Sequence, residues 1–151
     1  SSRRRHTRYG TVTGVQTCAL PISALSRYGS RYSQDFESTC NVSIPKGSNL
    51  CGVFVGWCLS ENSLDIPEKP QVARSYLKIG KEVESPQMGD ICVFWRESRN
   101  SWKGHVNIFI REEGDLIHCL GGNQGGLVQI LKYKKNRLLG FRRLQSWKKS
   151  I

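Results

Sequence analysis

The 151-residue chain has no long apolar run. Its densest apolar stretch, Leu50 to Leu59, is well short of the roughly 18 residues that a helix needs to cross a bilayer. Acidic residues are also scarce, since 12 Asp and Glu stand against 23 Lys and Arg for a net charge of +11. We therefore expect no membrane span, and a partner surface that is anionic or tolerates cations.

The basic residues also lack the concentrated, aromatic-rich stripe that is typical of a nucleic-acid groove. Four of them lie in the first 22 residues, which contain no acid: Arg3, Arg4, Arg5 and Arg8. The other 19 basic residues are interleaved with the 12 acidic ones, for a net charge of +7, except from Lys132 onward. We therefore expect no nucleic-acid partner.

The first 22 residues have no period of 2 or 3.6. Their basic start and mildly apolar continuation superficially resemble a signal peptide, but Gly14, Gln16 and Pro21 interrupt the apolar part. The stretch closely resembles a translated sequencing-adapter read fused to an unrelated reading frame. We expect residues 1–22 to be non-native or disordered, without a convincing signal peptide, and residues 23–151 to form a single domain.

The six cysteines invite a disulfide interpretation by their even number, but the surroundings of three of them argue against the framework of a small disulfide-rich protein. Cys58, Cys92 and Cys119 lie in strongly apolar segments, where a free cysteine behaves as a small hydrophobic residue. We expect reduced, structural thiols at these three positions.

Residues 23–49 are expected to be loop with a short helix around Gln34 to Ser38, and the first long element is a helix. Leu50 to Leu59 is apolar nearly all round, which predicts a buried helix, and Ser48 and Asn49 before it are good N-cap residues. A short amphipathic piece, Val72 to Ile79, follows and ends at a glycine suited to a C-cap.

From Pro86 the pattern changes to strands rich in Val, Ile, Phe and Tyr. The predicted strands are Asp90 to Arg96, His105 to Arg111, Leu116 to Leu120, Leu127 to Tyr133 and Leu138 to Arg143. The second and third are joined by Glu112-Glu113-Gly114-Asp115, a tight hairpin signal. A helix followed by an antiparallel meander predicts an α+β fold with the helix packed on a sheet of about five strands.

Cys51 is the candidate nucleophile. It lies in the first turn of the predicted helix, where unpaired N–H groups and the macrodipole stabilise a thiolate. Its own backbone N–H is also free to donate to a developing oxyanion. The alternative is that Cys51 is simply another apolar helix residue beside Cys58.

His105 is the candidate base, because it opens a strand directly after a glycine. Folding the hairpin about Glu113 and Gly114 places residue 105 opposite residue 122 or 123, so that Asn123 lies beside His105 and can orient its imidazole. The alternatives are a surface or core histidine and an Asn123 that merely adopts left-handed geometry in a glycine-rich turn.

Together these segments resemble the NlpC-type and CHAP cell-wall hydrolases, the latter being cysteine, histidine-dependent amidohydrolases/peptidases. The nucleophile helix is Leu50-Cys-Gly-Val-Phe-Val-Gly-Trp-Cys-Leu, and the other matching segments are Pro86-Gln-Met-Gly-Asp-Ile, Gly104-His-Val, Leu120-Gly-Gly-Asn-Gln and Arg137-Leu-Leu-Gly-Phe-Arg. The likeness runs from about residue 40 to residue 143 in the same order and spacing.

The resemblance implies a papain-like fold with Cys51 as nucleophile, His105 as general base and acid, and Asn123 as orienting residue. It also implies a monomeric bacterial or phage enzyme of the cell wall, periplasm or exterior. The enzyme would cleave an amide bond in the stem peptide of peptidoglycan, as amidase or endopeptidase, without cofactor or metal. The chain departs from the family at Leu50, where the family commonly has an aromatic or acidic residue. It also departs at Gly121, two residues before Asn123, since the third catalytic residue is His in many NlpC-type enzymes and Glu with Asn in many CHAP domains. His118 is therefore the alternative candidate for the third catalytic residue.

Two other functions remain open. Zinc could be held by Cys92, His105, His118 and Cys119, but neighbouring His118 and Cys119 point to opposite faces of a strand. A non-catalytic module on the same fold could instead bind the cell wall or nucleic acid through its basic end: Arg142, Arg143, Lys148 and Lys149.

Overall fold

The computed structural model of the chain describes residues 50–122 and 128–144. The predicted domain boundary at residue 22 and the two predicted N-cap residues, Ser48 and Asn49, lie outside these ranges. The twelve-residue helix α4 (Leu50–Glu61) is the longest helix in the described part of the chain and is too short to span a membrane. It confirms the predicted buried helix and extends it by two residues.

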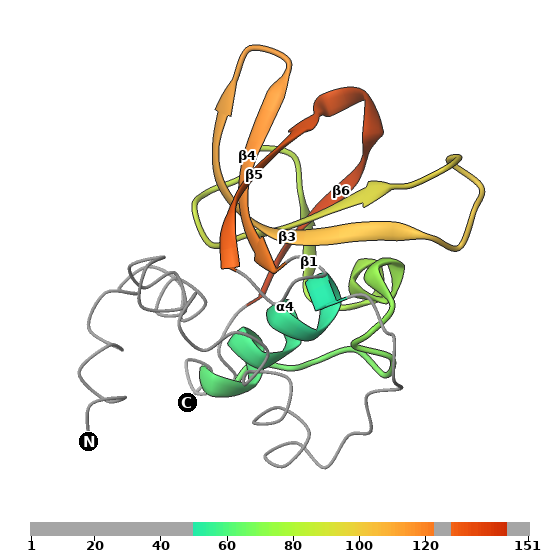
Figure 1. The fold of residues 1–151 in the computed structure, drawn as a ribbon. Coiled ribbons are helices and arrows are strands. Elements are labelled where there is room, and N and C mark those ends of the chain that lie inside the picture. Colours follow the sequence, from blue (N-terminus) through green and yellow to red (C-terminus); the bar gives the residue numbers. More distant parts are fainter. Residues whose placement is uncertain (1–49, 123–127, 145–151) are drawn as a thin grey trace.

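The other helical and strand elements of the described chain are two short 3-10 segments and six strands (Figure 1). The 3-10 segments are η3 (Ala73–Lys78) and η4 (Lys135–Arg137). The strands are β1 (Lys81–Val83), β2 (Ile91–Trp95), β3 (Gly104–Glu113), β4 (Leu116–Gly122), β5 (Val128–Lys134) and β6 (Leu138–Arg143). Together they form one antiparallel sheet in the order β1-β6-β2-β3-β4-β5.

The predicted α+β fold is confirmed, and each of the five predicted strands is present with small shifts at its ends. The prediction of about five strands missed β1. This strand has three largely exposed residues, two of them charged, and pairs only with β6 at the sheet edge. Such a strand carries no alternating apolar pattern, and charged residues are common on sheet edges.

The hairpin between β3 and β4 turns where the sequence predicts it. Gly114 has φ +59°, a left-handed conformation that glycine adopts without strain. A β-bulge between Phe109 and Arg111 shifts the pairing along the hairpin, so that Ile108 pairs with Leu120 on one side of it and Arg111 with His118 on the other.

The first core lies between α4, η3 and one face of the sheet (Figure 1). Helix α4 contacts β3 and β4, and its apolar residues meet those that point toward it from the strands. The fully buried members include Phe54, Val93, Val106 and Ile108. Because α4 packs on β3, the start of the helix is fixed against the start of that strand.

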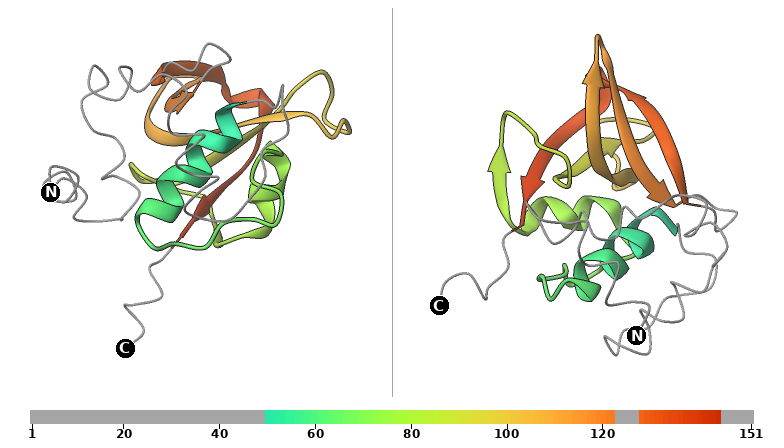
Figure 2. Two further views of the ribbon diagram at one scale, coloured as in Figure 1. Left: turned by 60° about the horizontal axis from the view of Figure 1, so that its bottom comes forward. Right: turned by 90° about the vertical axis from the view of Figure 1, so that its left-hand side faces the viewer.

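The second core lies on the other face of the sheet. The strands curve away from the helical layer (Figure 2), and the second core fills the concave side with Cys92, Phe94, Phe109, Ile117, Cys119 and Phe141. The predicted burial of Cys58, Cys92 and Cys119 is confirmed, and no disulfide joins two cysteines of the described residues. Alternate residues of β3 therefore serve different cores, with Val106 and Ile108 in the first and Phe109 in the second.

Gly52 and Tyr76 hold the start of α4 against the segment that leads into η3. The fully buried Tyr76 hydroxyl shares its hydrogen between the carbonyl oxygens of Gly52 and Pro70, at 2.5 and 2.9 Å. A Cβ on Gly52 would collide with the Pro70 carbonyl oxygen, which belongs to the backbone and has little room to yield. The close approach therefore requires glycine beside Cys51.

We predict that Gly52→Ala destabilises the protein by about 1–3 kcal/mol, the usual range for overpacking a buried position. In an uncrowded helix interior the same change would instead stabilise by about 1 kcal/mol. Gly140→Ala is the matched control, because a Cβ there meets only the Leu77 side chain at an ordinary 3.5 Å. Urea unfolding of both variants measures the difference, and equal stabilities would contradict the proposed crowding at Gly52.

Candidate functional site

Cys51 is the second residue of α4, as the sequence predicts, and its side chain is only 3% exposed. Burial raises the pKa of the Cys51 thiol above its ordinary value. The backbone of Val106 and of Gly52 and the charge of Arg96 oppose this effect without cancelling it. The helix start thus lowers the pKa of Cys51, as the sequence predicts, but burial outweighs this effect and leaves the thiol protonated at pH 7.

His105 lies near the start of β3, directly opposite Phe94 in the pairing of β2 with β3. Its ring centroid is 5.3 Å from that of Tyr133 on β5, and Tyr133 stacks on Phe94 with centroids 4.6 Å apart. Burial is the main reason that the pKa of His105 is lowered from 6.5, and the positive charges of Arg96 and Arg137 lower it further. The imidazole is therefore neutral at pH 7.

The structure brings the environments of Cys51 and His105 to the same end of β3. The Val106 backbone lies close enough to the Cys51 sulfur to lower the thiol's pKa, and Val106 follows His105 directly. Arg96 influences the pKa of both groups. Tyr133 touches the His105 ring, and the charge of Cys51 contributes to raising the tyrosine's pKa.

Asn107 and Tyr133 are two site residues that the sequence analysis missed. The Asn107 amide is fully buried and has no hydrogen-bond partner of good geometry in the described part of the chain. It nevertheless lies close enough to the Tyr133 hydroxyl to lower the phenol's pKa, which burial raises to about 12. A Cβ on Gly121 would collide with the Asn107 amide oxygen, so glycine leaves room for this amide.

The signal for Asn107 was present in the sequence. It is the only polar residue in the run Val106-Asn-Ile-Phe-Ile, and an alternating strand with a buried amide requires a partner for it. The signal for Tyr133 was weaker, because its contact with His105 depends on the curvature of the sheet.

Of the two candidates for the third catalytic residue, the structure describes only His118. Asn123 lies outside the described residues. His118 is buried and its Nε2 lies 3.1 Å from a Glu113 carboxylate oxygen. Its pairing partner, Arg111, is six residues along β3 from His105. His118 and His105 therefore lie toward opposite ends of β3.

The same separation bears on the zinc alternative. No three His, Cys, Asp or Glu side chains in residues 50–122 and 128–144 lie close enough together to hold a metal ion. Cys92 and Cys119 are near each other in the second core, where burial, and after it the neighbouring Cys119, raise the pKa of Cys92. The described residues therefore do not bring together the four candidate zinc ligands.

Arg74 in η3 fixes the loop that joins β2 to β3. Its guanidinium donates to the carbonyl oxygens of Lys103, Arg99 and Ser98 at 2.8, 2.7 and 2.9 Å. Gly104, which follows the loop, has no room for a side chain because a Cβ would lie 2.7 Å from the Phe94 carbonyl oxygen. The glycine before His105 thus allows β3 to pair closely with β2.

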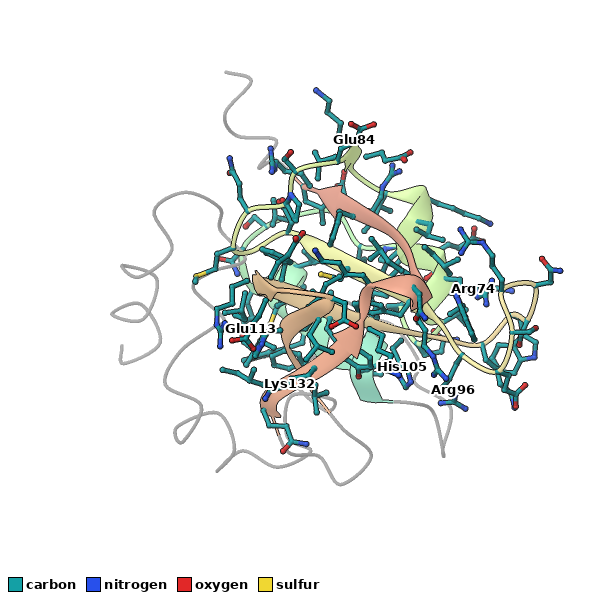
Figure 3. The ribbon with its side chains drawn as sticks, turned by 90° about the horizontal axis from the view of Figure 1, so that it is seen from above. Arg74, Glu84, Arg96, His105, Glu113 and Lys132 are labelled. Carbon is teal, nitrogen blue, oxygen red and sulfur yellow. The ribbon has the colours of Figure 1, made fainter. Side chains whose placement is uncertain are left out.

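Arg96 and Arg137 border the site on its outer side. Figure 3 shows Arg96 beside His105, with Glu113 well away from both. Arg137 lies over the Trp95 ring, 4.8 Å from its centroid, in a cation–π contact. No ion pair among the described residues involves either arginine.

Comparison with known proteins adds no family. No family model matches the chain, and no curated protein matches it significantly.

We predict that His105 titrates below pH 6.5 and that Arg137→Gln raises its pKa, because removing a positive charge makes protonation easier. Proton NMR of the imidazole signals measures both values, with His105 assigned by the loss of its signal in His105→Ala. Arg111→Gln removes an arginine from the distant half of β3 and should leave the titration unchanged. A pKa at or above 6.5 in the unmodified protein would contradict the structure.

Proposed function

We propose that the protein is a peptidoglycan hydrolase that cleaves an amide bond of the cell-wall stem peptide, with Cys51 as nucleophile and His105 as base. The observation that carries this proposal is the convergence of a first-turn helix cysteine and a strand-opening histidine at one end of β3. Nucleophile and base on separate elements fixed by packing are the usual arrangement in cysteine hydrolases.

The pKa values favour a neutral resting pair. Burial raises the pKa of Cys51 and lowers that of His105, so at pH 7 the thiol keeps its proton and the imidazole is free to accept it. In the proposed first step the sulfur attacks the amide carbonyl while His105 takes the thiol proton. The new C–S bond forms, the carbonyl oxygen becomes an oxyanion, and the Cys51 backbone N–H donates to it.

In the second step the imidazolium of His105 donates its proton to the leaving nitrogen as the C–N bond breaks, which releases an amine and leaves a thioester. Water then attacks the thioester, with His105 accepting its proton. The C–S bond breaks, the carboxylic product leaves and the thiol regains its proton. The sequence of steps uses no cofactor.

The imidazole needs a support that holds its orientation. The Tyr133 ring packs against His105 and stacks on Phe94, so it limits rotation of the imidazole on the inner side. We propose Asn123 as the hydrogen-bonding orienter, as the family resemblance implies, on a papain-like arrangement of helix and sheet. A cell-wall, periplasmic or extracellular location follows from the proposed substrate.

Cys51→Ala should abolish clearing of purified cell walls and leave the far-UV circular dichroism spectrum unchanged, because it removes the sulfur and little else. Turbidity loss of a cell-wall suspension measures the activity. Cys58→Ala is the matched control, since Cys58 is a fully buried cysteine of the same helix that the mechanism does not use. Continued lysis by Cys51→Ala would eliminate Cys51 as nucleophile.

The acid limb of kcat/KM should lie below pH 6.5 and coincide with the His105 titration, because protonated His105 cannot accept the thiol proton. Arg137→Gln should move the limb and the NMR titration upward together. A titration that moves while the limb stays in place would show that another group is the base. A protein that binds cell walls without any pH-dependent turnover would favour the non-catalytic alternative.

A further inference from the structure

Two arginines beside the site have no acidic partner among the described residues. Four of the five ion pairs in that part of the chain join a surface base to an acid, as Lys103 joins Glu97 at 2.8 Å, and the fifth joins His118 to Glu113. Glu97 follows Arg96 directly, but its carboxylate pairs with Lys103, which is the main cause of its lowered pKa. The acid nearest in sequence is therefore already engaged.

The strand geometry directs Arg96 toward the site. Phe94 lies opposite His105, and side chains two residues apart on a strand share a face, so Arg96 lies on the face that carries His105. The Arg96 backbone N–H donates to the Lys103 carbonyl at 3.3 Å, which keeps this residue in register just beyond the end of β2. Arg74 donates to the same Lys103 carbonyl oxygen and to the carbonyls of Arg99 and Ser98, so the backbone of Arg96 lies at the start of an anchored loop.

Arg137 is held differently, by stacking on Trp95, which pairs with Gly104 directly before His105. Its guanidinium rests on the Trp95 ring, and the Trp95 indole N–H donates to the Asn136 carbonyl oxygen at 3.3 Å. Stacking on the flat face of an indole restrains the guanidinium and leaves its edge N–H groups available. Both arginines act electrostatically on His105, so the base lies within the field of two cations.

Two cations that form no ion pair with the described residues are poorly explained by catalysis alone. One cation near Cys51 would suffice to favour the thiolate, and both disfavour the protonated His105 that must form during turnover. An anionic ligand would balance this charge, and a planar guanidinium binds carboxylates through two parallel hydrogen bonds.

We propose that Arg96 and Arg137 bind a free carboxylate of the substrate beside the scissile amide, and so select an anionic peptide over its amidated form. The inference rests on the proposed hydrolase function and names the substrate class of that site. Stem peptides carry carboxylates of this kind next to amide bonds, and the same residues also occur as carboxamides. The carboxylate would also neutralise the positive field when His105 becomes protonated.

The test uses synthetic stem peptides in matched pairs that differ only in a carboxylate or a carboxamide at one residue. The full-length protein should cleave one carboxylate form with kcat/KM at least about tenfold above its carboxamide partner, as expected for losing a hydrogen bond to a charged group. Arg96→Gln and Arg137→Gln should each reduce that preference to about twofold or less, mainly through KM. Arg111→Gln, in the distant half of β3, should keep the full preference.

Arg96→Lys distinguishes carboxylate binding by the guanidinium from the effect of the positive charge on the pKa values of Cys51 and His105. It keeps the positive charge that acts on Cys51 and His105 but loses the planar fork, so it should reduce the carboxylate preference while leaving the pH profile unchanged. Equal cleavage of both members of every pair by the unmodified protein would overturn the inference and leave the hydrolase function intact.

Peptide binding to the Cys51→Ala variant distinguishes a failure of the proposed carboxylate site from a failure of the proposed hydrolase function. Isothermal titration calorimetry of this variant with the same peptide pairs reports recognition without turnover. If the unmodified protein cleaves none of the peptides but Cys51→Ala binds the carboxylate form more tightly, the carboxylate site is supported and the hydrolase function is rejected. If Cys51→Ala shows no preference, the carboxylate site is rejected whatever the activity.

Discussion

The candidate site depends on the close approach of the first turn of α4 to the start of β3. Gly52 allows the helix to lie against the Pro70 carbonyl, and the Tyr76 hydroxyl ties the same two backbones together. On the strand side, Gly104 allows β3 to lie equally close to β2. A methyl group at Gly52 would push the first turn of α4 away from Pro70, and one at Gly104 would push the start of β3 away from β2.

Burial, the consequence of this close approach, determines the protonation of the proposed pair. Desolvation disfavours a charged thiolate and a charged imidazolium alike, so it moves the two pKa values apart in the direction that leaves both groups neutral. The helix start and Arg96 reduce this effect on Cys51, but they do not reverse it. Because both groups are neutral at rest, the free energy needed to separate their charges is required during the reaction. A bound anion and the oxyanion donors can reduce it there.

The sequence predicted the fold well where periodicity and glycine carried the information. The five strands from Asp90 onward alternate or are bounded by turn residues, and the Gly114 turn follows from left-handed geometry. It failed for β1, whose three residues have no apolar pattern.

The site was predictable only in part. The helix-start position of Cys51 and the strand-start position of His105 are local features, and both occur as predicted. The protonation state of Cys51 was not predictable, because burial depends on what the rest of the chain packs around the helix. Tyr133 reaches His105 across the concave side of a curved sheet, and curvature leaves no mark in a single strand's sequence.

The two ends of β3 differ in how their charges are balanced, and this difference separates the two histidines. Around His118, Glu113 contacts both the imidazole and Arg111. Around His105, the nearest charges are Arg96 and Arg137, which no acid among the described residues balances. A structural histidine is stabilised by a neighbouring carboxylate, whereas a base that must stay neutral at rest is favoured by neighbouring cations. The same cations make protonation of His105 costly unless an anion arrives, so the charge at this end of the strand links the proposed base to the charge of its substrate.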